Sequence, residues 1–273
     1  MTVPCGQCVG CRLERSRQWA VRCYHEASLY EDNCFITLTY SDDALPVGGS
    51  LVLADYQKFM KRLRKKFGSN IRFYHCGEYG ETTWRPHYHA CLFNFDFADK
   101  RKFSKTNNGY LYTSETLNEL WPFGHSLIGD VTFESAAYVA RYIMKKITGD
   151  GAEEHYQSVC NETGEIFNLR PEYTTMSRRP GIGAGWFDKY KEDVYFGDYV
   201  VVRGVKMRPP KFYDRSFEIA SPNRFRLLRG RRVMDARGHA DNNTPARLKV
   251  REEVAKARLK MLPRKLEGER YDT

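Results

Sequence analysis

The chain has 273 residues, 41% hydrophobic and 14% aromatic, so it can bury a core and is not disordered overall. It has no run of 18 apolar residues to span a membrane, and "MTVPCGQCVGC" lacks the apolar region of a secretory signal, so we expect a cytoplasmic protein. The net charge is +10, and residues 221–273 hold 15 Lys and Arg against 7 Asp and Glu, which suits nucleic acid or serves only as a soluble basic surface.

Three of the eight cysteines, Cys5, Cys8 and Cys11, cluster in "CGQCVGC". Eight cysteines are too few for a disulfide scaffold, and this spacing is typical of thiolates that bind zinc. A ferredoxin-type run would need another cysteine at position 15, which is Arg. A structural Zn²⁺ site needs a fourth ligand, for which the candidates are Cys23, His25, Cys34 or a more distant cysteine. Free thiols in a tight turn are the alternative.

The first half of the chain predicts a mixture of helices and strands. Residues 12–31 predict a helix, and the β-branched and aromatic "CFITLTY" at 34–40 predicts a strand. Asp55 is expected to cap a helix at 56–67, whose apolar residues have helical spacing: Tyr56, Phe59, Met60, Leu63 and Phe67. Two further strands are expected at 70–78 and 87–95, as antiparallel neighbours.

A short helix at 114–121, a strand at 124–132 and a helix at 133–147 follow, the last with Glu134 or Ser135 near its cap. Because the strands come in hairpins and do not strictly alternate with helices, the fold class is α+β, with a mostly antiparallel sheet flanked by helices. We expect one domain over residues 1–150 and a basic C-terminal extension, which we expect to bind DNA, over 151–273.

The pattern is weaker in that extension. "PGIGAG" at 180–185 has the look of a dinucleotide loop, but no strand is expected before it and no helix after it, so we interpret it as a plain loop. "DYVVVRGVKM" predicts a strand pair. "NTPARLKVREEVAKARLKML" predicts a charged, peripheral helix.

Two histidines alternate with a tyrosine in "RPHYHACLF" at 85–93. Side chains at i and i+2 of a strand face the same way, so His87 and His89 project side by side. They are either two satisfied histidines or two ligands of one metal. Glu78 would lie roughly opposite His87 as a third ligand, with Glu81 in the loop as its competitor. Such a set suits Mg²⁺ or Mn²⁺, and also catalytic Zn²⁺.

Tyr138 and Tyr142 lie one helical turn apart in "AAYVARYIMKKI". On a helical projection they lie opposite the apolar stripe, beside Arg141 and Lys145. A tyrosine oxygen is a workable nucleophile toward a polarised phosphate, which cations also bind. The alternative is a helix covered by other layers on both faces. With the histidine strand and the basic extension, this helix indicates phosphoryl transfer in DNA.

These motifs together resemble the rolling-circle replication initiators of the HUH endonuclease superfamily, and within it the initiators of microviruses of the gokushovirus branch. "FITLTY" (35–40) is similar to the first motif of that family. "RPHYHACLF" is similar to its histidine motif and "YVARYIMKK" (138–146) to its two-tyrosine motif. "PCGQCVGCRLERSRQW" (4–19) is also similar to gokushovirus proteins. The resemblance implies a ferredoxin-like or RNA-recognition-motif-like core.

The resemblance also implies roles for residues. His87 and His89 would be metal ligands completed by Glu78, for Mg²⁺ or Mn²⁺. The nucleophiles would be Tyr138 and Tyr142, and Lys145 matches the motif lysine. Arg141 departs from the pattern, which often has Lys there; it keeps the charge but cannot exchange a proton. We further assign three cations to DNA binding: Arg85, Arg141 and Lys146.

The resemblance therefore predicts an enzyme that nicks single-stranded origin DNA through a 5′-phosphotyrosine and later rejoins the strand as a circle. Host helicase and DNA polymerase would be partners, no membrane would be involved, and the enzyme would work in the cytoplasm of the infected bacterial host. A plasmid or transposon relative with the same chemistry is one alternative. A basic DNA-packaging or scaffold protein is the other, but it has no need of the histidine and tyrosine motifs.

Overall fold

The structure, a computed structural model, describes residues 5–80, 83–106, 109–141, 146–147, 149–160 and 163–261. Its centre is a seven-stranded sheet in the order β4-β5-β6-β1-β3-β2-β9, and its neighbouring strands pair antiparallel. The α+β fold with an antiparallel sheet is thus confirmed. The strands are β1 (Asn33–Tyr40), β2 (Arg72–Tyr79), β3 (Pro86–Phe93), β4 (Arg101–Thr106), β5 (Gly109–Thr113), β6 (Gly124–Gly129) and β9 (Tyr173–Met176).

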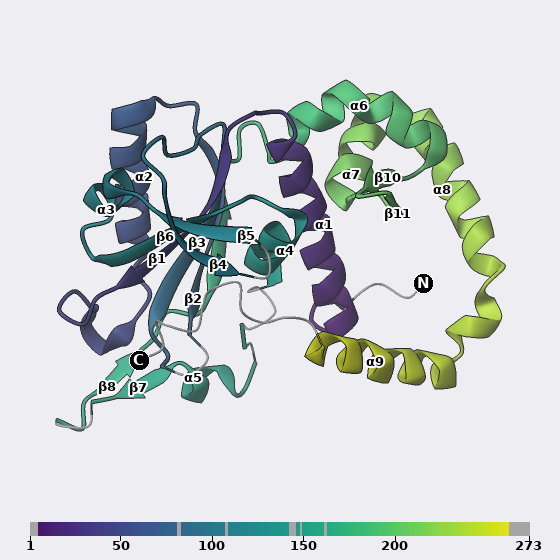
Figure 1. Cartoon of the computed structure of the whole chain (residues 1–273). Helices are drawn as coiled ribbons and strands as arrows, with labels where there is room; N and C mark the ends of the chain where they lie inside the picture. The colour runs from purple at the N-terminus through teal and green to yellow at the C-terminus, as the bar shows by residue number, and fades with distance from the viewer. Residues whose placement is uncertain are drawn as a thin grey trace.

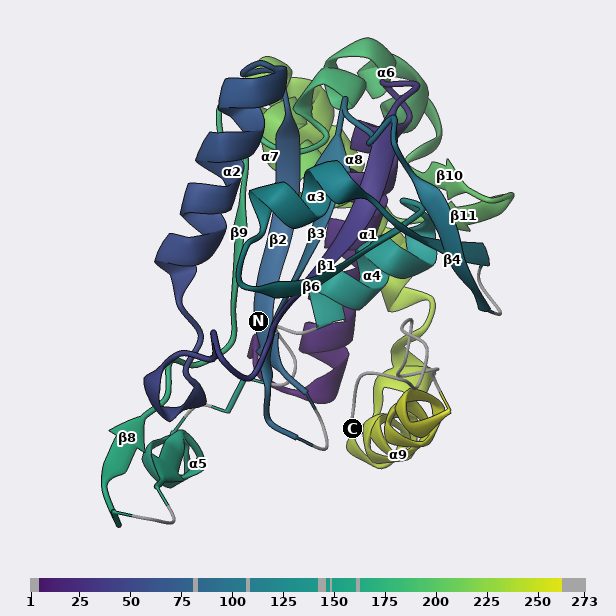
Figure 2. The same cartoon turned by 60° about the vertical axis from the view of Figure 1, so that its left-hand side comes forward.

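Helices cover both faces of this sheet (Figure 1, Figure 2). On one face lie α2 (Leu53–Phe67) and α3 (Glu115–Leu120), and on the other lie α1 (Val9–Ala27) and α4 (Phe133–Arg141). The smaller elements between them are η1 (Val47–Gly49), α5 (Ala152–His155), β7 (Gln157–Val159) and β8 (Ile166–Asn168). In the described part of the chain, no helix combines the length and apolar character needed to cross a membrane.

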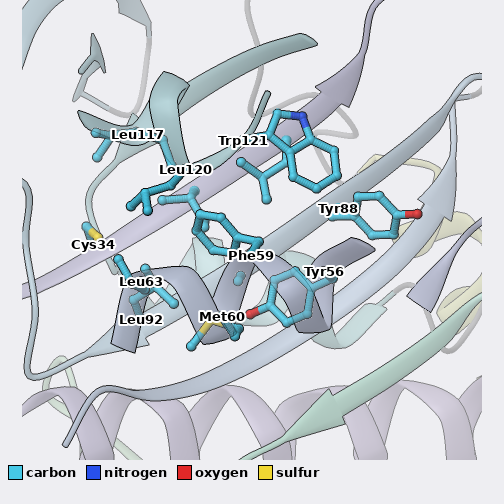
Figure 3. Close-up of a cluster of buried hydrophobic side chains, with 14 of the residues drawn as sticks. Cys34, Tyr56, Phe59, Met60, Leu63, Tyr88, Leu92, Leu117, Leu120 and Trp121 are labelled. Carbon is cyan, nitrogen blue, oxygen red and sulfur yellow. The ribbon is translucent and has the colours of Figure 1, made fainter. Parts of the chain in front are cut away.

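The larger hydrophobic core lies between the sheet and α2 with α3, as Figure 3 shows. Phe59 and Leu63 of α2 are fully buried there against Trp121, because apolar residues three and four apart share one helix face. Burial of each such side chain stabilises the fold by about 1.5–3 kcal/mol. Our prediction that Asp55 caps α2 is wrong: the N-cap is Val52, and Asp55 lies in the first turn, where it accepts a hydrogen bond from Tyr40 Oη at 2.9 Å.

On the other face, α4 is packed between the sheet and α1. Its start is fixed by a reciprocal pair: Thr132 N donates to Ser135 Oγ at 2.8 Å, and Ser135 N donates to Thr132 Oγ1 at 3.1 Å. This is the arrangement of a capping box, and it confirms Ser135 near the cap. Ser16 of α1 donates from Oγ to the Ala137 carbonyl at 3.3 Å, which joins the two helices. The predicted extent to residue 147 is too long, since residues 146–147 are not helical; residues 142–145 lie outside the described ranges.

A third core joins α1 to the C-terminal elements, which are α6 (Ala184–Gly197), β10 (Val200–Val202), β11 (Val205–Met207), α7 (Lys211–Ala220), α8 (Pro222–Arg237), η3 (Ala240–Asn243) and α9 (Pro245–Lys260). The strand pair β10–β11 and the exposed helix α9 confirm two predictions. The division into domains at residue 150 stays a prediction, although β9 from the later part joins the central sheet.

The glycine-rich segment 180–185 differs from our interpretation as a plain loop, because it opens α6 with Gly183 as the N-cap at φ 78°. The buried carboxylate of Glu26 accepts a hydrogen bond from Gly183 N at 2.6 Å and pairs with Arg72. An internal carboxylate therefore occupies the positive end of this helix, where a dinucleotide loop would bind phosphate.

His25 is a second buried polar link between α1 and the C-terminal elements. Its Nδ1 lies 3.0 Å from Tyr213 Oη, and its ring stacks on Trp186 at 3.5 Å between centroids. Burial lowers the pKa of His25 to about 3. Below the unfolded-state pKa of about 6.5, the unfolded chain therefore binds a proton that the folded chain excludes. This contribution to stability is present above that pH and is lost as the pH falls.

We predict that His25→Gln flattens the pH dependence of the free energy of unfolding by about 1 kcal/mol per pH unit between about pH 6 and about pH 4. Urea unfolding of wild type and variant at several pH values measures this. The matched control is His239→Gln, since His239 is exposed. Parallel pH profiles of wild type and His25→Gln would contradict the prediction.

Candidate active site

The pairing of β1, β3 and β2 places two rows of side chains across the sheet, on the face that α4 covers. Thr39, His87 and Glu78 pair in one row. Thr37 and His89 pair in the next row, two residues along β3. The predicted position of Glu78 opposite His87 is confirmed, and so is the shared face of the two histidines.

Hydrogen bonds orient both imidazole rings. Thr39 Oγ1 lies 3.0 Å from His87 Nδ1, and Thr37 Oγ1 lies 3.0 Å from His89 Nδ1. Glu78 reaches diagonally to the second row, with Oε1 2.7 Å from His89 Nε2. Because a hydroxyl both donates and accepts, each threonine can serve either tautomer of its histidine. The Nε2 atom of each ring is then the one suited to a metal.

The residues fit a divalent ion held by two imidazoles and a carboxylate. His87, His89 and Glu78 are 6%, 1% and 3% exposed, so the site is more enclosed than the open site we expected. Gly80 supplies room beside it: a Cβ added there would lie 3.1 Å from His87 Nε2. The two imidazole centroids are 6.4 Å apart, which leaves space for an ion between the rings.

Tyr138 lies against the histidine row. Its ring centroid is 5.2 Å from that of His89 and 6.4 Å from that of Phe35, both edge-on, and the residue is 7% exposed. Our prediction that this tyrosine faces away from the core is wrong. The projection assumed one covered face, whereas α4 is covered by the sheet on one side and by α1 on the other. The same packing brings the predicted nucleophile to the predicted ligand.

Comparison with known proteins gives the family. Residues 33–147 match the family model of the replication-associated proteins of the ORF2 type. Replication-associated protein VP4 of Bdellovibrio phage phiMH2K is 34% identical over 232 residues, which cover 81% of this chain and 69% of that protein. Replication-associated protein ORF2 of Spiroplasma virus 4 is 37% identical over 231 residues, covering 80% and 68%. The chain belongs to this family.

A third relative, Replication-associated protein ORF4 of Chlamydia phage 1, is 28% identical over 221 residues, which cover 77% of this chain and 52% of that protein. No solved structure matches the chain. The segment that matches the replication-associated family, 33–147, contains the two rows and Tyr138. The cysteine cluster and helices α6 to α9 lie outside it.

The remaining predicted residues fall in three groups. Tyr142, Lys145 and the competing ligand Glu81 lie outside the described residues. Arg141 Cζ lies 6.0 Å from the centroid of the Tyr138 ring, so a cation does accompany this tyrosine. Lys146 is exposed.

Arg85, a predicted DNA contact, has a structural role. Its Nη1 donates to the Tyr40 carbonyl at 2.8 Å, and its Nη2 pairs with Asp42, so it fixes the loop after β1. It also lines a cavity of about 460 Å³, together with Trp84 and His155. A contact to DNA would have to compete with these internal partners.

Sequence reasoning missed Thr37 and Thr39. Both lie in "FITLTY", where they alternate with apolar residues that face α2 and α3. Pairing that strand antiparallel with the histidine strand would have found them, since hydroxyls beside imidazoles are natural orienting groups. Gly80 was also missed, and no pattern in the sequence singles it out.

Proposed function

We propose that this chain starts rolling-circle replication of a small single-stranded DNA phage, as a metal-dependent enzyme that nicks and rejoins origin DNA through tyrosine. The observation that carries the proposal is the contact of Tyr138 with His89, which sets a nucleophile beside two imidazoles and a carboxylate. The names and phage sources of the relatives support a phage replicon over a plasmid or transposon. A packaging or scaffold protein would have no use for this arrangement.

His87, His89 and Glu78 would hold Mg²⁺ or Mn²⁺. When bound, the ion supplies a Lewis acid for the scissile phosphate. Thr37 and Thr39 keep the two imidazoles turned toward the ion, and the α4 layer limits the water around them. Because the surroundings are buried, charge stabilisation there is stronger than it would be in water.

In the nicking step, a tyrosine Oη forms a bond to the scissile phosphorus and gives up its proton. The bond from phosphorus to the 3′ oxygen breaks, and that oxygen takes up a proton to become a free 3′-hydroxyl. The 5′ end stays on the enzyme as a phosphotyrosine. Lys145 is suited to donate the proton, whereas Arg141 supplies only charge. Arg141 and Lys146 balance the charge of the phosphates.

A host polymerase, with a host helicase, would extend the 3′-hydroxyl in the cytoplasm of the infected bacterium. After one round, the second tyrosine cleaves the regenerated origin. The newly freed 3′-hydroxyl then attacks the first phosphotyrosine, closing a circle and restoring that tyrosine. No nucleotide cofactor is needed, because the phosphotyrosine conserves the bond energy.

The first prediction for this enzyme concerns the metal. His87→Ala and His89→Ala should abolish nicking of a single-stranded origin oligonucleotide in Mn²⁺, while the protein stays folded. Gly80→Ala should weaken Mn²⁺ binding about 10-fold, because its Cβ crowds His87 Nε2 and changes around a site typically cost roughly 10–100-fold in metal affinity. Titration calorimetry measures the affinity.

The matched control is Gly151→Ala, since a Cβ there would meet nothing within 4 Å. Glu78→Gln should weaken Mn²⁺ binding more than Glu81→Gln does. Equal nicking by wild type and the double histidine variant would refute the metal site, and a larger defect at Glu81 would refute only the third ligand.

The second prediction concerns the tyrosines. Tyr138→Phe and Tyr142→Phe should each retain some first-strand cleavage but fail to release circles, because release needs two nucleophiles in succession. The double variant should form no adduct. We expect Tyr142 to be the more reactive, because Lys145 follows it by three residues and can exchange a proton. Tryptic mass spectrometry of the adduct with a suicide oligonucleotide identifies the residue.

Tyr110→Phe, at an exposed tyrosine of β5, is the matched control and should behave as wild type. Phenylalanine keeps the ring of Tyr138 in its buried contact, so loss of activity would not reflect lost packing. DNA found on a residue other than the two tyrosines would overturn the mechanism, whereas DNA mainly on Tyr138 would overturn only the order.

The third prediction concerns the basic extension. Deletion from residue 221 would remove Phe225 and Leu228, which are buried in the C-terminal core, so point variants are the sharper test. Arg226 and Arg229 are exposed on α8. Changing both to Gln should lower the salt dependence of single-stranded DNA binding by up to about 1.4 in log K against log salt, through fewer released counterions.

The matched control neutralises two exposed lysines of α2, Lys61→Gln with Lys65→Gln, on the opposite side of the molecule in Figure 1. Both double variants should still nick a short origin oligonucleotide. Fluorescence anisotropy at several salt concentrations gives the slopes. An equal loss of slope from α2 and α8 would mean that α8 is no preferred DNA surface.

A further inference from the structure

We propose that Cys5, Cys8 and Cys11 bind one Zn²⁺ ion through three thiolates, at the N-terminal end of α1. Among the described residues, they form the group of three potential ligands whose ligand atoms all lie within 4.8 Å of one another. The Sγ atoms of Cys5 and Cys11 are 3.9 Å apart. Two sulfurs bound to one tetrahedral zinc at about 2.3 Å each would lie about 3.8 Å apart, so the spacing fits without rearrangement.

The backbone around the cluster favours thiolates. Cys8 N donates to Cys5 Sγ at 3.3 Å, and Cys8 is the N-cap of α1, whose first turn contains no acidic residue. The positive end of the helix therefore meets the sulfurs and not a carboxylate. The backbone N–H groups of Cys8 and Gln7 lower the pKa of Cys5 to about 7.

Two other chemistries fit the cluster less well. A disulfide needs sulfurs about 2.05 Å apart, roughly half the spacing between Cys5 and Cys11. A ferredoxin-type cluster needs a further cysteine where Arg15 stands. Cys5 and Cys8 are exposed and Cys11 is partly exposed, so an ion can enter directly from solvent.

The structure excludes the three named fourth ligands that the sequence suggested. Cys23 and His25 lie far beyond Cys11 in the same helix, which places them roughly 18 and 21 Å along its axis. Cys34 is buried in the core beneath α2 and α3. Within the described part of the chain, the site therefore has three protein ligands from one short segment, and its fourth position belongs to water.

This site would act on a part of the molecule that the proposed nicking reaction does not use. Gly6, Gly10 and Cys11 line a groove of about 940 Å³ whose lining also includes Lys206 and Arg208. A metal that ties Cys5 to Cys11 fixes the N-terminal part of this lining. Its role is to order the segment and not to react, so metal content and nicking are separable.

The test measures metal in the full-length chain. Wild type purified under reducing conditions and equilibrated with Zn²⁺ should contain one zinc per chain by elemental mass spectrometry. The triple variant Cys5→Ser, Cys8→Ser, Cys11→Ser should contain none. Cys160→Ser, a partly exposed cysteine outside the cluster, is the matched control and should keep one. Replacing Zn²⁺ by Co²⁺ should give a thiolate-to-metal charge-transfer band.

A second measurement uses wild type alone, in case the triple variant fails to fold. Zn²⁺ should slow alkylation of Cys5, Cys8 and Cys11 by about 10-fold or more relative to chelator-treated protein, because a metal-bound thiolate is a poorer nucleophile, while Cys160 alkylates equally in both. Peptide mapping records the rates. Zinc retained by the triple variant, alkylation that Zn²⁺ does not slow, or a Cys5–Cys11 disulfide in reduced protein would overturn the proposal. Because zinc is the readout, failure here would leave the nicking proposal intact.

Discussion

The site depends on the register between β3 and its neighbours. Side chains alternate along a strand, so a slip of one residue would turn His87 and His89 toward α2 and bring Tyr88 to the α4 side. The hydroxyl of Tyr88 opposes such a slip. It lies 3.0 Å from Tyr40 Oη, accepts a hydrogen bond from Val52 N at 2.7 Å, and is fully buried. The tyrosine between the histidines thus fixes the face on which they act.

The enclosure of the site restricts how DNA can approach it. His89 and Tyr138 are buried between the sheet and α4, so a phosphate cannot reach them through either layer. His87 is the more exposed imidazole and lies near the beginning of β3, where Gly80 leaves space beside Nε2. That end of the row is therefore the entrance, and single-stranded DNA, which is thin and flexible, suits it better than a duplex.

The sequence predicted what depends on local periodicity. The pleat placed His87 and His89 on one face, and the strand order placed Glu78 opposite His87. It could not predict the orientation of Tyr138, because helical projection sees one apolar stripe and α4 has two covered sides. β4 and β5 were missed because their residues are mostly polar and half exposed, and β9 because its four residues carry little pattern. The diagonal contact from Glu78 to His89 needs side-chain geometry.

Helix α1 connects this site to the basic extension. One side of α1 carries Ala20 and Cys23 into the core shared with α4, and the other carries Val21 into the core of α6, α7 and α8. Arg232 of α8 pairs with Asp198, which follows α6, and with Asp214 of α7, so α8 is fixed to both. The exposed arginines of α8 therefore keep a set position relative to the histidine row. DNA bound along α8 is presented to the nicking site by a packed scaffold, and a flexible tether would give no such alignment.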